Sequence, residues 1–231
     1  LSIVLLQNKN NVLPLQKGKE KIAVIGPNAD NTPMMWGNYN GTPNRTVTIL
    51  DGIKAKQKKL FSAWGCDLTY DKVMECLMAS QCSFEGKKGM KGTFWNNRRM
   101  EGKPVTTQYY TTPLAVTTFG MHNFAPGVQL EDFSAKYETV FTPKESGEYV
   151  VKVDGCGHFE LFIDGVQQFR HHIWRTTPNR VAIQAEAGKS YNIQILFAHI
   201  HTYNANLAIN IAKEYPIDYQ ATIDQLKGID K

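Results

Sequence analysis

Hydrophobic and polar positions divide the chain into two kinds of pattern. Residues 21–27 are a short apolar run rich in β-branched residues that closes in a Gly-Pro turn, which is typical of a buried strand. Residues 47–59 set apolar side chains among lysines as a surface helix does, and residues 60–64 form a second apolar run. Strand, helix and strand in this order predict a parallel crossover of an α/β sheet.

A period of two dominates from about residue 89 to residue 213. Large apolar residues alternate with other residues in four segments: residues 149–153, 159–163, 191–197 and 207–211. Asp164-Gly165 between two such runs predicts a tight hairpin turn. Short alternating strands at this density predict an antiparallel β-sandwich or barrel with a core of its own.

The last segment returns to helical spacing. Ile217, Ala221 and Leu226 share roughly one face, and Gly228 is a typical helix stop. The sequence therefore predicts the first part of an α/β domain over residues 1–85, an inserted β module over residues 89–213 and a return helix over residues 214–231. The expected fold class is α/β plus all-β: an incomplete α/β sandwich with an inserted antiparallel β-sandwich or barrel.

Charge and hydropathy exclude two classes of partner. The net charge is +5, and lysines cluster over residues 54–59 and 87–91, the second cluster close to Phe94 and Trp95. No nucleic-acid motif accompanies them, so we interpret these lysines as solvated helix and loop faces. No apolar run approaches the roughly 20 residues of a membrane-spanning helix. We expect neither a nucleic-acid partner nor a membrane span.

The cysteines do not indicate a metal site. The four are Cys66, Cys76, Cys82 and Cys156, and their spacing fits no zinc pattern. We predict no metal and no cofactor, while three disulfide pairings and free thiols all stay open. Cys156, between Gly155 and Gly157, suits either a nucleophile or a small residue in a tight turn, and the second reading is favoured.

The residues offer no catalytic pair. Glycoside hydrolysis needs two carboxylates, about 5–5.5 Å apart for retention or 6.5–9.5 Å for inversion. The acidic residues of the first segment favour capping or surface roles instead; they are Asp30, Asp51, Asp67 and Asp71. The turn at residues 26–30 lacks the glycine spacing of a nucleotide site, and Pro27 removes an N–H.

One loop has the composition of a sugar-binding segment. Residues 36–43 (WGNYNGTP) combine flat aromatic faces with amides and glycines. Sugars present apolar C–H faces and hydroxyl edges that such side chains can contact. An ordinary turn-rich loop that packs Trp36 inward explains the composition equally well.

The first segment resembles the second domain of glycoside hydrolase family 3. The resemblance rests on residues 2–15 (SIVLLQNKNNVLPL) and 21–30 (KIAVIGPNAD), and residues 37–43 and 65–67 extend it in the same order. It covers about residues 2–72 and is closest to the β-glucosidase and β-xylosidase branch. It implies a retaining, exo-acting β-glycosidase with Asn38, Tyr39 and Gly41 near the mouth of its active site.

The β module resembles the sandwich first described in the anthrax protective antigen, which is inserted into this domain in many family 3 enzymes. Residues 89–97 (GMKGTFWNN), 141–149 (FTPKESGEY) and 161–165 (LFIDG) carry the resemblance. Calcium-dependent lectins of this type place two adjacent aspartates before a glycine, whereas residues 154–157 here read DGCG. With one carboxylate missing, a calcium site is not expected.

The family resemblance places the catalytic residues outside this chain. It implies a nucleophile on a barrel that precedes Leu1 and an acid/base beyond Lys231, so no catalytic residue is assigned and the chain alone is expected to be inactive. Phe119 and Trp174 are expected to contact sugar, although a core position for Trp174 is equally open. The implied partners are an oligosaccharide or β-glycoside substrate and the remainder of the same enzyme.

Two other functions stay open at this point. One is a stand-alone carbohydrate-binding or adhesion module, and the other is a structural module that forms a homo-oligomer. The family implies an exported location, periplasmic or extracellular. The residues do not decide between glucose and xylose.

Overall fold

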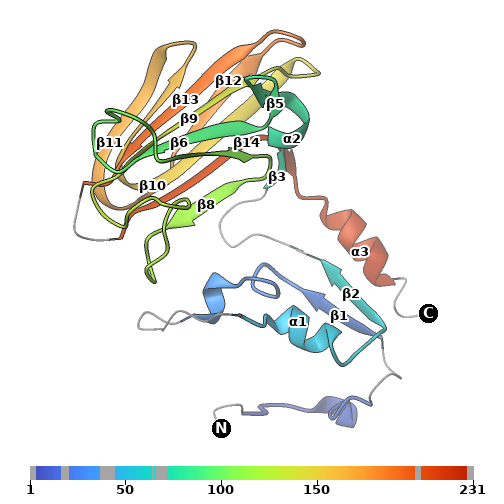
Figure 1. The fold of residues 1–231 in the computed structure, drawn as a ribbon. Coiled ribbons are helices and arrows are strands. Elements are labelled where there is room, and N and C mark those ends of the chain that lie inside the picture. Colours follow the sequence, from blue (N-terminus) through green and yellow to red (C-terminus); the bar gives the residue numbers. More distant parts are fainter. Residues whose placement is uncertain are drawn as a thin grey trace. The chain divides into compact units, whose positions relative to one another are not determined.

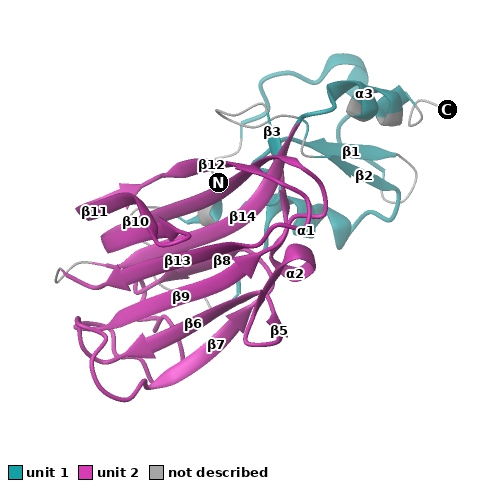
Figure 2. Cartoon of the chain, turned by 90° about the horizontal axis from the view of Figure 1, so that it is seen from above, with its two compact units in different colours: residues 1–73, 216–231 teal, residues 74–215 magenta. Residues whose placement is uncertain are grey.

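The computed structural model describes residues 4–16, 21–36, 45–63, 65, 72–200 and 204–227. The chain forms two compact units (Figure 1). One consists of residues 1–73 and 216–231, and the other of residues 74–215, shown in teal and magenta in Figure 2.

The smaller unit contains a parallel strand pair. Its elements are η1 (Lys9–Asn11), β1 (Ile22–Ile25), η2 (Pro33–Met35), α1 (Ile49–Lys54), β2 (Leu60–Ala63) and α3 (Tyr219–Lys227). β1 pairs in parallel with β2, from Ile22 opposite Leu60 to Ile25 opposite Ala63, and α1 lies between them in the chain. The predicted strand, helix and strand are confirmed. Completion of an α/β sandwich stays a prediction.

Two of the acidic candidates have a structural role at the start of α1. The Thr48 hydroxyl accepts from the Asp51 N–H at 3.2 Å, and the Asp51 carboxylate accepts from the Thr48 N–H at 3.3 Å. The same hydroxyl donates to the Asp30 carboxylate at 2.8 Å. This capping box satisfies N–H groups that a helix end leaves without partners. Capping is therefore confirmed for Asp51, and Asp30 accepts a hydrogen bond from the capping hydroxyl, while Asp67 and Asp71 lie outside the described residues.

The larger unit is almost entirely β structure. Its elements are β3 (Lys72–Cys76), α2 (Met78–Gln81), β4 (Cys82–Phe84), β5 (Lys87–Lys88), β6 (Met90–Trp95), β7 (Thr106–Tyr110), β8 (Leu114–Thr117), β9 (Ser134–Phe141), β10 (Gly147–Ile163), β11 (Val166–Thr177), β12 (Arg180–Ala185), β13 (Tyr191–Ala198) and β14 (Asn206–Pro216). Within the residues described, the twelve strands form one curled sheet, ordered β3-β14-β10-β13-β9-β4-β5 with side branches. The predicted antiparallel β module is confirmed.

The long strand β10 explains how the sheet curls. Its first half lies between β12 and β14, and its second half lies between β11 and β13. One continuous strand therefore contributes to two differently directed parts of the sheet. The change occurs around Gly155–Gly157, where the pairing with β11 is irregular. Bulges and glycines at such points allow a strand to bend.

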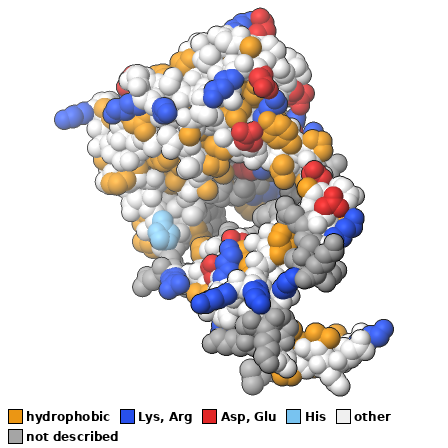
Figure 3. Space-filling model, turned by 90° about the vertical axis from the view of Figure 1, so that its right-hand side faces the viewer, with side chains coloured by type: hydrophobic (Ala, Val, Ile, Leu, Met, Phe, Trp, Pro, Cys, Tyr) orange, Lys and Arg blue, Asp and Glu red, His pale blue; other side chains and the backbone are white. Residues whose placement is uncertain are grey.

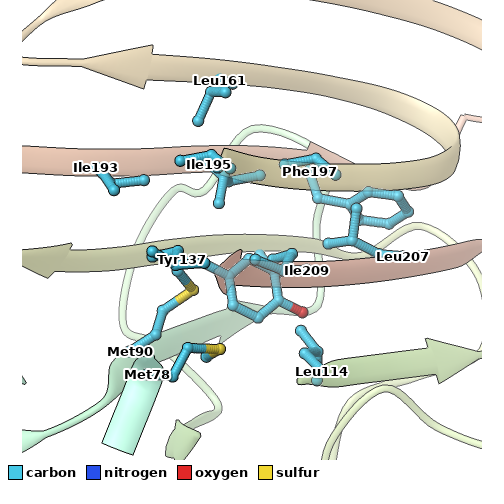
Figure 4. Close-up of a cluster of buried hydrophobic side chains, with 14 of the residues drawn as sticks. Met78, Met90, Leu114, Tyr137, Leu161, Ile193, Ile195, Phe197, Leu207 and Ile209 are labelled. Atoms are coloured by element: carbon cyan, nitrogen blue, oxygen red, sulfur yellow. The ribbon is translucent and has the colours of Figure 1, made fainter. Parts of the chain in front are cut away.

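The alternating faces predicted from the sequence meet in one core. Leu161 of β10, Ile195 of β13 and Ile209 of β14 are each at most 1% exposed. Figure 4 shows their side chains together with those of Tyr137, Met78 and Met90. Each large side chain buried in this way contributes about 1.5–3 kcal/mol of stability. The hairpin at Asp164-Gly165 is also confirmed, since both residues have positive φ angles, of 49° and 78°.

The lysine clusters are solvated. Lys54, Lys56, Lys58 and Lys59 are exposed, as are Lys87 and Lys88. Lys91 forms an ion pair with Glu85 at 2.7 Å. Basic, acidic and apolar side chains are interspersed on the face drawn in Figure 3. In the residues described, no helix is both long and apolar enough to cross a membrane.

Candidate functional site

An irregular pairing of β10 with β11 borders a hollow of the larger unit. Gly155 lies opposite Thr177, and Gly157 lies opposite Ile173. Residues 174–176 therefore face the single residue Cys156. Such a bulge redirects side chains that a regular strand would send to alternate faces, and bulges are frequent beside binding sites.

Close packing against neighbouring aromatic rings requires glycine at positions 155 and 157. A Cβ atom on Gly155 would lie 3.0 Å from the Phe159 ring, and one on Gly157 would lie 2.9 Å from the Phe197 ring. Gly157 also has a φ of 143°, which residues with side chains rarely adopt. The core rings beneath β10 therefore fix the position of the bulge.

Cys156 is a buried residue within a strand. It is 5% exposed and lies inside β10, so its predicted place in a tight turn is wrong. The reason is that its two flanking glycines serve a bulge and close ring packing. Burial raises the pKa of the Cys156 thiol, which is the opposite of what a thiolate nucleophile needs. A catalytic role for Cys156 therefore has no support.

The bulge opens into a hollow of about 560 Å³. In the part of the chain that the structure describes, it is lined by Cys156, Trp174, Arg175, Thr176, Asn204 and Asn206. The Asn206 side-chain amide donates to the Thr176 hydroxyl at 2.9 Å and joins two walls. Trp174 is 68% exposed, so its alternative position in the core is wrong. A flat aromatic face beside amides and a hydroxyl is suited to a sugar ring.

A second hollow of about 460 Å³ adjoins the first, since Asn204 lines both. Its other lining residues are Thr118, Met121, Gln129, Leu130, Glu131, Asp132 and His199. The His199 ring stacks on Phe133 at 5.5 Å, and its Nδ1 accepts from the Asp132 N–H at 3.3 Å. The Thr118 hydroxyl accepts from the Ala205 N–H at 2.8 Å. These contacts hold the side chains of His199 and Thr118 in place at the second hollow.

The structure locates two of the five predicted sugar contacts. Trp174 lines the first hollow, and Phe119 is 39% exposed next to Thr118 of the second. The other three, Asn38, Tyr39 and Gly41, lie outside the described residues and stay predictions. Trp36 is 39% exposed and donates its indole N–H to the Thr46 hydroxyl at 2.9 Å, so it does not pack fully inward.

Sequence reasoning missed the polar residues of the first hollow. Arg175, Thr176, Asn204 and Asn206 carry no local motif, and only the folded chain brings them together. The two glycines beside Cys156 were the available signal for a bulge. In the described part of the chain, no group of three or more His, Cys, Asp or Glu residues could hold a metal ion.

Comparison with known families decides what the larger unit is. The sequence profile of the PA14 domain matches residues 86–220, which is more than half of the chain. The chain belongs to the PA14 domain family. The larger unit, residues 74–215, is called the PA14 module below.

Known relatives of this PA14 protein are glycosidases by name. The chain is 64% identical over its whole length to a xylan 1,4-β-xylosidase of Xylanibacter ruminicola, of which it spans 27%. Over 70% of its length it is 32% identical to a β-glucosidase of Rhizobium radiobacter, of which it spans 19%. The resemblance to β-xylosidases and β-glucosidases with a protective-antigen-like module is thereby confirmed.

A solved structure shares the fold. The β-glucosidase of Kluyveromyces marxianus in complex with glucose covers 96% of this chain with a TM-score of 0.54 and 20% identity. The chain corresponds to 29% of that protein. In each of these comparisons, this PA14 chain spans less than a third of the relative.

Proposed function

We propose that the chain is part of a retaining, exo-acting β-glycosidase and that its PA14 module holds sugar beside catalytic groups supplied by the rest of the enzyme. The observation that carries this proposal is the 64% identity to a xylan 1,4-β-xylosidase over all 231 residues. Identity to the β-glucosidase relative is half as high, at 32%. The substrate we propose is therefore a β-xyloside in preference to a β-glucoside.

The first hollow supports binding without cleavage. Its described lining offers an exposed indole, two amides and a hydroxyl, and no carboxylate. Hydrolysis by a retaining glycosidase needs two carboxylates at the scissile bond. The PA14 module accordingly shapes the outer, leaving-group side of the substrate pocket, and Trp174 and Phe119 contact sugar there. Asn38, Tyr39 and Gly41 contribute from the α/β domain, and the enzyme acts outside the cytoplasm.

Titration calorimetry of residues 1–231 with xylo-oligosaccharides tests the binding role. We expect a Kd on the order of 1 mM, equivalent to about 4 kcal/mol, because one aromatic face and a few hydrogen bonds contribute. Trp174→Ala should abolish the heat of binding. Val166→Ala is the matched control, because Val166 is 63% exposed at the other end of β11.

Three outcomes would contradict this function. A micromolar Kd for the chain alone favours a stand-alone carbohydrate-binding module. A mass that rises with concentration in light scattering, without sugar binding, favours a structural module. Turnover of aryl β-xylosides or β-glucosides by the purified chain would show that it holds catalytic groups of its own.

A further inference from the structure

Arg175 differs from three of the other four arginines of the PA14 module, which form ion pairs. Arg98 is paired with Asp132, Arg170 with Glu160 at 3.5 Å, and Arg180 with Glu148 and Glu214 at 3.0 and 2.7 Å. The Arg175 guanidinium has no ion pair or hydrogen bond within the described part of the chain. A fork of five N–H donors is thus available in the first hollow.

Among its described lining residues, the first hollow contains no acidic side chain that could offset this guanidinium. The others are neutral: Cys156, Trp174, Thr176, Asn204 and Asn206. The adjoining hollow contains Glu131 and Asp132, and Asp132 is already engaged by Arg98. The first hollow therefore presents one positive charge beside an exposed indole.

The bulge places the Arg175 guanidinium beside the Trp174 indole. Trp174 and Arg175 are consecutive, and in a regular strand they would point to opposite faces of the sheet. Because residues 174–176 together face Cys156, both side chains line the same hollow. The arrangement combines a flat apolar surface with a fork of donors at one site.

We propose that the first hollow binds an anionic sugar residue, a hexuronate unit carried by the glycoside substrate. This inference rests on the proposed function, because it takes the ligand to be a saccharide. Guanidinium and carboxylate groups match in a planar, bidentate geometry, and such charge-assisted pairs are stronger than neutral hydrogen bonds. Trp174 contacts the apolar face of the ring, Arg175 binds the carboxylate, and Asn204, Asn206 and Thr176 contact hydroxyls. A hollow of about 560 Å³ is within the range of about 300–1,000 Å³ of ligand pockets.

A pair of matched glycosides tests whether the first hollow prefers a sugar that carries a carboxylate. Methyl β-D-glucuronoside and methyl β-D-glucoside differ only in a carboxylate that replaces a hydroxymethyl group. Each is titrated into ¹⁵N-labelled residues 1–231, and the indole N–H signal of Trp174, assigned with Trp174→Phe, reports binding. We expect the glucuronoside to bind about tenfold more tightly, as a charge-assisted bond implies. Added salt should reduce this difference because it screens exposed charges.

Two arginine variants identify the residue responsible. Arg175→Gln should bring the two glycosides to equal affinity. Arg99→Gln is the matched control, because Arg99 is also exposed and its guanidinium also lacks an ion pair in the described residues. The Arg99→Gln variant should retain the tenfold preference for the glucuronoside. Circular dichroism of both variants establishes that they fold.

The results separate this inference from the proposed function. If the glucoside and the glucuronoside perturb Trp174 with equal affinity, the hexuronate site is refuted while sugar binding by the module stands. Equal losses in Arg99→Gln and Arg175→Gln would refute the site as well, since net charge alone would explain them. If neither glycoside perturbs Trp174, the hexuronate site is refuted, and the titration with xylo-oligosaccharides decides the proposed function separately.

Discussion

The hydroxyl of Tyr215 donates a hydrogen bond to the Glu75 carboxylate at 3.0 Å, across 140 positions of the chain. Tyr215 is the last residue but one of β14, and Glu75 lies in β3, which is the neighbour of β14 in the sheet. The two ends of the PA14 module therefore lie side by side. This is the property that allows a module to be inserted into another domain.

Tyr215→Phe should loosen this junction without unfolding the module. The variant loses one exposed hydrogen bond, while the buried core of the sheet keeps its contacts. We expect faster hydrogen exchange at residues 74–76 and 214–216 and an unchanged melting temperature. Mass spectrometry of exchanged peptides measures the effect, with Tyr219→Phe as the control because Tyr219 is an exposed tyrosine of α3. Equal exchange in all three proteins would show that the hydrogen bond does not hold the junction.

Gly157→Ala should destabilise the module and disturb the first hollow. The added methyl group would meet the Phe197 ring at 2.9 Å, at a residue whose φ is 143°. Backbone strain of this kind costs about 1–3 kcal/mol. Gly165→Ala is the control, because Gly165 has a φ of 78° and open space around its Cβ position. Urea denaturation should give a clearly larger loss for Gly157→Ala, and equal losses would mean that Phe197 does not constrain the bulge.

The regular parts of this fold could be predicted because their causes are local. Burial of one sheet face imposes the alternation seen in residues 191–197, and Asp164-Gly165 supplies the positive φ angles of a hairpin turn. Helix α1 was predicted over residues 47–59 and spans Ile49–Lys54. The pattern Thr48-x-x-Asp51 was a readable signal for its start.

The first hollow could not be predicted because its cause is not local. It depends on the pairing of β10 with β11 and on Asn204 and Asn206 from a third part of the chain. Trp174 was singled out by its residue type, but its surroundings follow from strand register. Arg175 looks like any exposed arginine until the register places it beside Cys156 and Asn206.

Ile195→Ala should show how much more the buried face of β13 contributes to stability than its other face. Ile195 is fully buried, and the next residue, Leu196, is half-buried on the other face of the sheet. Truncation of a buried isoleucine to alanine costs about 2–5 kcal/mol, because apolar contact is lost and a cavity remains. Leu196→Ala should cost clearly less. Urea denaturation of both variants checks this, and the reverse order would mean that the register of β13 is wrong.

Cys82→Ala should make the free energy of unfolding change less with pH in the alkaline range. Burial raises the pKa of the Cys82 thiol from 9.0 to about 12, and the hydrogen bond with Thr139 opposes this only in part. The unfolded chain therefore releases this proton near pH 9, whereas the folded chain keeps it until about pH 12. The stability due to the protonated thiol is present in full below pH 9 and is lost as the pH rises through about 12.

The size of this effect follows from the shift. Three pKa units correspond to about 4 kcal/mol as an upper bound, since one unit is about 1.4 kcal/mol. Urea denaturation between pH 8.5 and about 10.5, where the unfolded thiol ionises first, should show a steeper loss of stability in the wild type than in Cys82→Ala. Cys76→Ala is the control, because it keeps Cys82 and removes only the smallest of the causes that shift the pKa of its thiol, so it should follow the wild type closely. If Cys82→Ala shows the same slope as the wild type, the Cys82 thiol is not held protonated by burial.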